Sequence, residues 1–446
     1  MKNFFLLQLC FLLLIPALVK AQSIHEKADS LLAAFSRQHL FSGTVIIARK
    51  GNVIFEKSYG QANRKENTPN SSSTTFRIGS VSKPFTAMII LQLQEKGLLH
   101  ISEPLSKYLK DYSKSDSVTI EQLLNHTSGI RSISSLHQFK NERLKMKGRE
   151  DVLNLLNSQP LIYTPGSKWQ YSNSNYMLLA YVAENIRGKT MSELVKEFAA
   201  AHELNDTGMD YDGRPEPYKA LGYEAGPVED FVHVTDYNVA IISGAGGMYS
   251  TARDLLKLDQ LLYSNKIVNE DTKQKMFTAG KGDYGYGWET GKYNGRIEVG
   301  HSGSIEGFKS MWLRYPESGT TIIFLSNYWN VPGQEICDKL KAIAFDEAYE
   351  FPVFYQYQRI SDNDLKLLEG EYNFNGGMKM TLEASSGMIL SKLKGQPTVG
   401  FKPISATEFH CKANDARLLF KMDENSKVTG FTLIMGKQEM EWKKAE

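Results

Sequence analysis

Apolar and polar positions follow two different periods along the chain. Near its start, the apolar residues of "IHEKADSLLAAFSRQHL" recur three to four positions apart, which predicts an amphipathic helix. "SGTVIIARKGNVIFEKSYG" then places two strand-like runs around Lys50-Gly51-Asn52, a pattern typical of a β-hairpin. Strand-like runs return late, in "YGYGWET", "RIEVGHSG" and "SMWLRYPESGTTIIFLSN", the last with a turn at Glu317-Ser318-Gly319.

Between these two sets of strands, from Val81 to about Tyr263, the pattern is mostly helical. The candidate helices are "IEQLLNHTSGI", "REDVLNLLNSQ", "YMLLAYVAENIRG" and "TARDLLKLDQLLYS", and another, "QEICDKLKAIAFDEAYE", follows the late strands. We therefore predict an α+β fold, in which the early and late strands form one antiparallel β-sheet flanked by helices. The middle of the chain is inserted as a helical subdomain.

Beyond "FPVFYQYQ" the chain changes to short alternating strands separated by turns. This pattern of short strands and turns predicts a small C-terminal β domain over residues 361–446, barrel-like or lipocalin-like. With a linker at 351–360, residues 22–350 form the larger domain.

The first 21 residues have the features of a cleaved signal peptide. Lys2 precedes an apolar stretch, and Val19 and Ala21 occupy the small-residue positions before the expected cut. A membrane helix is the alternative, but Gln8 and Pro16 interrupt the stretch, which falls short of the roughly 20 apolar residues that a span needs. We expect an exported protein, periplasmic or extracellular, with no membrane span after cleavage.

Composition excludes several classes of protein. The 446 residues carry 52 Lys and Arg against 50 Asp and Glu, so no basic surface for nucleic acid is predicted. Only Cys337 and Cys411 remain after cleavage, which leaves one disulfide open but no disulfide framework. Neither an H-E-x-x-H motif nor a Cys and His cluster is present, so no metal or cofactor is expected. The oligomeric state stays open.

Ser80 and Lys83 stand at the start of an apolar segment in "FRIGSVSKPFTAMIILQLQEKG". Residues three apart share one face of a helix, and Pro84 is tolerated only in a first turn, so the helix should begin near Ser80. Apolar walls and the positive end of the helix dipole both favour a neutral lysine amine, which can accept the proton of a serine hydroxyl. The alternative is a serine cap followed by a surface lysine.

Two further motifs contain candidate polar groups. In "QYSNSNY", Tyr171 and Asn173 point the same way if the segment is extended, and they offer a proton shuttle and a substrate-binding amide. In "IEVGHSGSIEGF", His301 can bind a carboxylate or assist proton transfer, and Gly303 leaves room for a substrate backbone. Each motif alone also fits a turn or a strand end without function.

In this order, "SVSK", "YSN" and "HSG" resemble the S-x-x-K, Y-x-N and K-T-G or H-x-G motifs of the penicillin-recognising serine hydrolases, in the branch of class C β-lactamases and DD-carboxypeptidases. Flanking stretches such as "GAGGMYSTARDLLKL" and "YGYGW" extend the resemblance over residues 25–345. It implies the same α+β fold.

The resemblance also implies roles. Ser80 would form an acyl-enzyme, while Lys83 and Tyr171 share the proton transfers, with the main base left undecided. Asn173 would hold a substrate amide and His301 would act electrostatically. The backbone amides of Ser80 and Ser304 would form the oxyanion hole.

One departure bears on the substrate. Most class C β-lactamases have lysine at the position of His301, whereas carboxypeptidases, D-aminopeptidases and esterases of the branch have histidine. A neutral or half-charged imidazole binds a penicillin carboxylate less firmly. We therefore expect peptidase or esterase action on a small molecule or peptide, with β-lactam hydrolysis or a non-catalytic sensor of the same fold as alternatives. His126, in "LLNHTSG", is interpreted as an interior structural histidine.

A different fold is the remaining rival. "GHSGS" nearly matches the G-x-S-x-G nucleophile elbow, which would make Ser302 the nucleophile of an α/β-hydrolase. An elbow requires a helix directly after the serine, but a glycine-containing turn and a strand hairpin follow here. His410, in the C-terminal domain, is the only histidine after Ser302.

Overall fold

A six-stranded antiparallel sheet forms the centre of the larger domain in this computed structural model, which describes residues 22–213, 218–228, 230–234, 238–352, 354–374 and 377–445. The signal peptide predicted over residues 1–21 lies outside them. The strand order is β10-β11-β12-β13-β1-β2, so the first two strands pair with the late ones. Their bounds are β1 Gly43–Arg49, β2 Asn52–Tyr59, β10 Glu289–Tyr293, β11 Arg296–Ile305, β12 Phe308–Tyr315 and β13 Thr320–Ser326.

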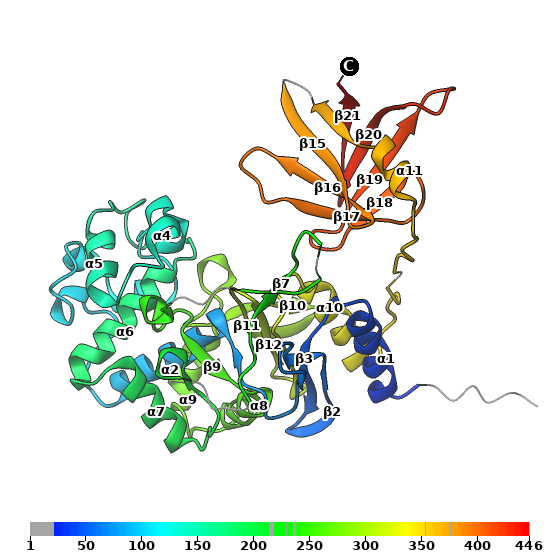
Figure 1. Cartoon of the computed structure of the whole chain (residues 1–446). Coiled ribbons are helices and arrows are strands. Elements are labelled where there is room, and N and C mark those ends of the chain that lie inside the picture. Colours follow the sequence, from blue (N-terminus) through cyan, green and yellow to red (C-terminus); the bar gives the residue numbers. More distant parts are fainter. Residues whose placement is uncertain are drawn as a thin grey trace, which may run out of the picture.

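Helices cover both faces of this sheet (Figure 1). Helices α1 (Ile24–Arg37) and α10 (Gly333–Ala344) pack on one face, where Val45, Ile47 and Phe324 contribute to the core. On the other face, α2 (Ser82–Glu95) and α8 (Ala252–Leu261) share a core with Ile46, Trp312 and Ile323. The alternation of neighbours such as Ile46 and Ile47 between the two cores is the period of a buried strand.

The inserted region continues that second core. It contains α3 Ile120–Leu124, α4 His137–Glu142, α5 Arg149–Asn157, α6 Asn173–Arg187, α7 Met191–Ala201 and α9 Glu270–Phe277. Three small sheets accompany it: β3 (Gln61–Asn63) with β4 (Thr68–Pro69), β5 (Phe76–Arg77) with β9 (Met248–Ser250) and β6 (Gly208–Met209), and β7 (Tyr223–Glu224) with β8 (Val232–His233). The predicted α+β fold is confirmed.

One local prediction needs correction, and the structure decides one point that the sequence left open. Most of "YGYGWET" is a turn, and β10 begins only at Glu289, because Gly287 takes a φ of +84° and the Gly285 amide bonds to the Trp288 carbonyl. The disulfide left open by the sequence does not form, since Cys337 and Cys411 are free, buried thiols in different domains.

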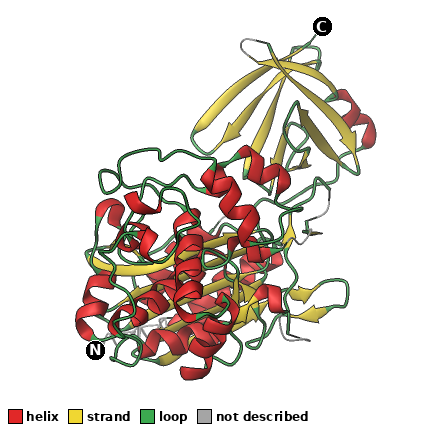
Figure 2. Cartoon of the chain, turned by 90° about the vertical axis from the view of Figure 1, so that its left-hand side faces the viewer, coloured by secondary structure: helices red, strands yellow, loops and turns green. Residues whose placement is uncertain are grey.

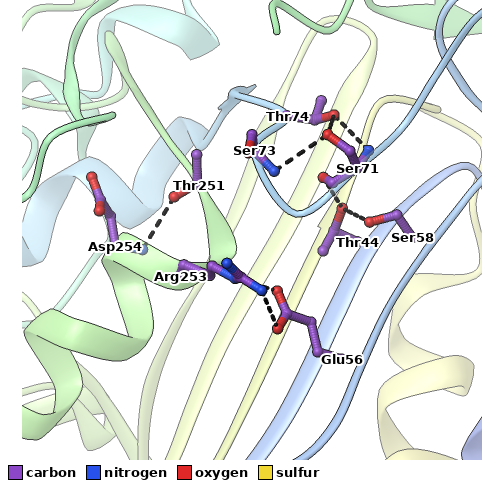
Figure 3. A network of polar contacts seen from close by, with 9 residues as sticks. All are labelled: Thr44, Glu56, Ser58, Ser71, Ser73, Thr74, Thr251, Arg253 and Asp254. Carbon is purple, nitrogen blue, oxygen red and sulfur yellow. Dashed lines mark hydrogen bonds and ion pairs between the residues drawn. The ribbon is translucent and has the colours of Figure 1, made fainter.

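Polar contacts hold α8 and the loop before β5 against the β1–β2 edge (Figure 3). Arg253 makes a two-fold ion pair with Glu56, at 2.7 and 3.0 Å, and the Thr44 hydroxyl contacts Ser58 at 2.9 Å and the Ser71 carbonyl at 3.3 Å. The loop leads directly into the segment that carries Ser80. These contacts therefore help to fix the position of that segment.

The C-terminal domain is a closed eight-stranded antiparallel barrel, as predicted, and forms a separate body at one end of the molecule (Figures 1 and 2). Its interior is filled by apolar side chains, among them Tyr372, Phe431 and Trp442. Helix α11 (Asp362–Leu367) precedes β14 Gly370–Phe374, β15 Met378–Ser385, β16 Met388–Leu393, β17 Val399–Pro403, β18 Glu408–Cys411, β19 Ala416–Met422, β20 Val428–Met435 and β21 Gln438–Lys444.

The barrel contacts the larger domain mainly at the β7–β8 hairpin. Asp230, in this hairpin, accepts hydrogen bonds from Lys402 of β17 at 2.8 Å and lies 2.7 Å from Nδ1 of His39 and 3.6 Å from Lys412. The Asn330 side chain donates to the Ala413 carbonyl in the barrel at 3.1 Å. The interface is therefore polar and charge-paired.

Candidate active site

Ser80 lies in a 3-10 turn, η1 (Gly79–Val81), directly before α2. Gly79 takes a φ of +49°, and a Cβ on it would lie 2.8 Å from the amide nitrogen of Ser304, so only glycine lets this turn pack so closely on β11. The buried Ser82 hydroxyl donates to the Gly79 carbonyl at 2.7 Å and accepts from the Met248 amide at 3.2 Å. The Ser82 hydroxyl thus links the turn to the backbone of Met248.

Lys83 is fully buried and makes three polar contacts. Its Nζ lies 2.9 Å from Ser80 Oγ, 2.8 Å from Asn173 Oδ1 and 2.7 Å from the Ala245 carbonyl. Burial lowers the pKa of this amine well below its usual range. A neutral amine has two N–H groups, which match the two carbonyl oxygens, and one lone pair, which is left for the Ser80 proton. The geometry thus suits a base beside a hydroxyl group.

Tyr171 and Asn173 complete the surroundings of Lys83. Nζ lies 4.9 Å from the centre of the Tyr171 ring, and burial raises the pKa of the Tyr171 phenol, an effect that a hydrogen bond with Ser80 partly offsets. Tyr171 is therefore a protonated phenol at neutral pH. Asn173, the first residue of α6, is oriented by Ser134, whose hydroxyl accepts from Nδ2 at 3.0 Å.

His126 supports Tyr171 from the interior side. Its ring is buried, with its centre 4.5 Å from the centre of the Tyr171 ring. Nδ1 accepts from the Ser172 amide at 3.3 Å and contacts Asn175 Nδ2 at 3.1 Å. The structure places this histidine in the interior, directly behind the segment that carries Tyr171.

Strand β11 forms the opposite wall. Its partner β10 pairs only as far as Gly300, so the strand edge beyond that residue is not paired by β10. A Cβ on Gly303 would lie 2.1 Å from both the Ile78 carbonyl and Ser310 Oγ. The glycine is thus required for β11 to pack on the turn before Ser80, and its backbone also lines the larger of the two pockets at Ser80.

His301 lies beneath the cleft, with its side chain only 1% exposed. Nδ1 donates to the Ser302 carbonyl at 2.7 Å, which leaves Nε2 to accept from the Tyr284 hydroxyl at 2.9 Å. Burial, together with the nearby Lys83, lowers the pKa of His301 to about 3. The ring is therefore neutral at physiological pH.

Two pockets meet at Ser80. The smaller, of about 130 Å³, lies on the side of Asn173, Ala245 and Trp329, and an ion pair between Arg143 and Glu306 forms part of its wall. The larger, of about 840 Å³, contains Tyr171 and extends to Lys309 on β12. The serine hydroxyl can thus be reached from two pockets, of which one is much larger than the other.

Several of these residues carry no signal in the sequence. Ala245 acts through its backbone carbonyl, and Ser134, Tyr284 and Lys309 belong to no motif that predicts their contacts with Asn173, His301 and Ser304. Ala245 in "GAGG" and Tyr284 in "YGYGW" lie in stretches that carry the family resemblance, but the resemblance gave neither residue a role.

The nucleophile-elbow alternative does not fit the structure. Ser302 lies inside β11, its hydroxyl donates to Glu289 at 3.1 Å, and β12 follows instead of a helix. His410 bonds to Tyr357 and Asp415, near the domain junction.

The described residues offer neither a metal-binding cluster nor a membrane-spanning helix. They contain no group of three or more His, Cys, Asp or Glu side chains arranged to hold a metal ion. No helix in the same part of the chain is both long and apolar enough to cross a bilayer.

The sequence of the chain is similar to a family model and to several known proteins. The family model described as Beta-lactamase matches residues 28–344. Penicillin-binding protein 4* of Bacillus subtilis is 28% identical over 439 residues, 91% of this chain and 95% of the relative. The B. subtilis protein named as penicillin-binding protein PbpX is 34% identical over 302 residues, 65% of this chain and 71% of its own.

Solved structures agree on the fold. A penicillin-binding protein from Bacillus halodurans superposes with a TM-score of 0.63 at 29% identity, covering 70% of this chain and 98% of its own. The D-amino acid amidase of Ochrobactrum anthropi SV3, in complex with L-phenylalanine amide, gives a TM-score of 0.64 at 20% identity, covering 73% of this chain and 99% of its own.

Proposed function

The chain belongs to the Beta-lactamase family of serine hydrolases, and from this premise we propose that it is an exported peptidase- or esterase-type enzyme that cleaves an amide or ester through a Ser80 acyl-enzyme. The observation that carries the proposal is the set of three contacts at Lys83 Nζ, because it leaves the amine lone pair directed at the Ser80 hydroxyl. The apolar segment over residues 1–21 supports export.

Acylation uses groups that already touch one another. Ser80 Oγ attacks the substrate carbonyl carbon while its proton passes to Lys83 Nζ. The oxyanion that forms accepts hydrogen bonds from the backbone amides of Ser80 and Ser304. Tyr171 then protonates the leaving group and recovers a proton from Lys83, which becomes neutral again. Because the Tyr171 pKa is raised and the Lys83 pKa is lowered, Lys83 is the base and Tyr171 the acid.

The second half-reaction releases the acyl group. A water molecule gives its proton to Lys83 and attacks the ester carbonyl, and Lys83 passes that proton to the departing Ser80 Oγ, which restores the alcohol and the neutral amine. Asn173, whose Oδ1 is held by Lys83, presents its Nδ2 side toward the small pocket, where it can meet an acyl-side amide. The small pocket favours a compact acyl side chain. In this scheme His301, being neutral, contributes no charge for a β-lactam carboxylate.

The test is turnover by purified protein of three chromogenic substrates: a p-nitrophenyl ester, a D-alanyl peptide and a cephalosporin. Ser80→Ala should abolish turnover and labelling by a fluorophosphonate probe, while retaining the far-UV circular dichroism of the parent. Ser302→Ala, which alters an exposed serine of the same cleft, is the matched control and should retain both. Unchanged turnover in Ser80→Ala would disprove the acyl-enzyme at Ser80. Cephalosporin turnover well above peptide turnover would favour the β-lactamase alternative.

A further inference from the structure

Lys309 on β12 places an ammonium group at the edge of the cleft. It lies opposite Ser304 in the β11–β12 register, and its Nζ donates to Ser304 Oγ at 2.6 Å. The same nitrogen lies 4.0 Å from the centre of the Trp329 ring. Lys309 and Ser80 line the same large pocket. The cation is thus held over an aromatic face beside the residue whose amide would bind the oxyanion.

The charges around Lys309 leave it without a carboxylate partner. Arg143 and Glu306, the charged pair of the small pocket, bind one another. In the large pocket, Glu289 accepts from Ser302 and Glu335 lies 3.5 Å from Lys339. Among the ion pairs of the described residues, none includes Lys309, and burial lowers its pKa with no acidic neighbour to oppose the effect. A bound carboxylate would compensate this charge.

The side of the cleft indicates which part of a substrate Lys309 meets. Tyr171, the proposed proton donor to the leaving group, lines the large pocket, whereas Asn173 lines the small one. Lys309 lines the large pocket, so it belongs to the leaving-group side. His301, on the neighbouring strand β11, is neutral and buried, and so cannot supply the charge there.

We propose that Lys309 determines specificity by binding a carboxylate carried on the leaving group. The preferred substrates are then amides in which the leaving group is an amino acid with a free α-carboxylate, the chemistry of a carboxypeptidase. This inference rests on the proposed function and specifies its substrate class. No reacting atom is assigned to Lys309: it holds the anion by a charge-assisted hydrogen bond in addition to the one it gives Ser304.

The experiment compares two matched substrates, an N-acyl-D-alanyl-D-alanine and the same dipeptide with a C-terminal amide. Because the two substrates differ only at the C-terminal group, the ratio of their kcat/KM values measures the contribution of the carboxylate to recognition. For the parent we expect the acid to be preferred. Lys309→Gln should reduce the ratio about 10- to 100-fold, which is the usual effect of losing a hydrogen bond to a charged group. The ratio should fall because kcat/KM decreases for the acid and not for the amide. Lys309→Arg should restore most of the preference.

Lys292→Gln is the matched control, because Lys292 is an exposed lysine on β10 of the same sheet and lies outside both pockets at Ser80. It should leave the ratio as in the parent. If Lys309→Gln leaves the ratio unchanged, or lowers both rates equally, the proposal is wrong.

A binding measurement separates this inference from the proposed function. Calorimetric titration of Ser80→Ala with each dipeptide requires no turnover. Tighter binding of the acid than of the amide, lost in Ser80→Ala/Lys309→Gln, supports the role of Lys309 even if the parent hydrolyses neither substrate. Equal binding of acid and amide, or no binding of either, overturns it.

Discussion

Lys83 and Tyr171 both contact the hydroxyl group of Ser80, and their environments drive their pKa values in opposite directions. Burial favours the neutral form of each side chain, which makes the amine a base and the phenol an acid at the same pH. A single physical cause, the low polarity of the site, therefore supports both of the proposed roles.

We expect Lys83→Ala and Tyr171→Phe each to reduce kcat/KM by roughly 10³-fold or more, because each interrupts the same proton relay. The double variant should lose at most about tenfold more than the worse single variant, since one relay cannot be broken twice. Pre-steady-state acylation rates measure this effect directly. Fully multiplicative losses would show that the two residues act in separate steps.

A second residue-scale prediction concerns acid stability. His301 has a folded pKa of about 3 against an ordinary value of 6.5, so between these pH values the unfolded chain binds a proton that the folded chain does not. The free energy of unfolding should fall as pH drops through this window, by at most about 5 kcal/mol from His301. Urea unfolding of His301→Asn should show a shallower pH dependence.

His126 is also buried and its pKa is lowered, so the slope should decrease in His301→Asn without vanishing. His100→Asn, an exposed position, is the control and should retain the parent slope. An unaltered slope in His301→Asn would show that the ring is charged in the folded protein.

At the scale of elements, the site depends on the contact between strand β11 and the turn η1. Two glycines, Gly79 and Gly303, bring the backbones together where side chains would collide. The contact sets the distance between the Ser80 hydroxyl and the Ser304 amide, which belong to segments more than 200 residues apart along the chain. Packing of backbone on backbone leaves this distance little freedom.

Gly303→Ala should therefore impair both stability and catalysis. The new methyl group meets the Ile78 carbonyl, and relief requires a shift of the turn that carries Ser80. Overpacking of this kind costs about 1–3 kcal/mol, and we expect kcat/KM to fall about 100-fold or more. Gly291→Ala on β10, where a Cβ has no neighbour within 4 Å, is the control for both measurements. Parent-like kinetics in Gly303→Ala would mean that β11 can shift without affecting Ser80.

At the scale of the whole molecule, the barrel is linked to the cleft through the β7–β8 hairpin. Gly222, just before β7, lies against Gly307 in the β11–β12 turn, and the Trp329 amide donates to the Tyr223 carbonyl at 2.8 Å. Trp329 lines the small pocket beside Ser80, and the next residue, Asn330, bonds to the barrel. The domain interface and the cleft thus share one segment.

We expect Asp230→Asn to weaken the interface by about 1–2 kcal/mol, since it removes the charge that Lys402, Lys412 and His39 surround at a partly exposed site. The measurement is the rate of proteolysis between residues 354 and 360, together with KM for a turned-over substrate. Both should rise relative to Glu371→Gln, which removes a barrel carboxylate paired with Lys379 away from the interface. Equal proteolysis in the two variants would show that Asp230 does not hold the barrel.

Local sequence patterns predict the class of fold and the motif residues that lie around Ser80. The period of the apolar residues was sufficient to predict the β1–β2 and β12–β13 hairpins, the helices α1, α8 and α10, and the barrel. Strand and helix periods are local properties of a chain, so they can be recognised without knowledge of the fold. S-x-x-K could be recognised because a short spacing places two side chains on one helix face, and the structure brings Tyr171 and Asn173 to that pair. Helices α7 and α9 were not singled out.

What each of these groups can do depends on its surroundings in the folded protein. Whether His301 is charged depends on burial and on Lys83, the need for glycine at position 303 depends on Ile78 and Ser310, and Lys309 becomes a candidate ligand only because β12 sets it beside Ser304. These properties arise from neighbours that the fold brings together. Charge, protonation and space are set by the sum of surrounding atoms, and a local pattern of residue types does not contain that sum.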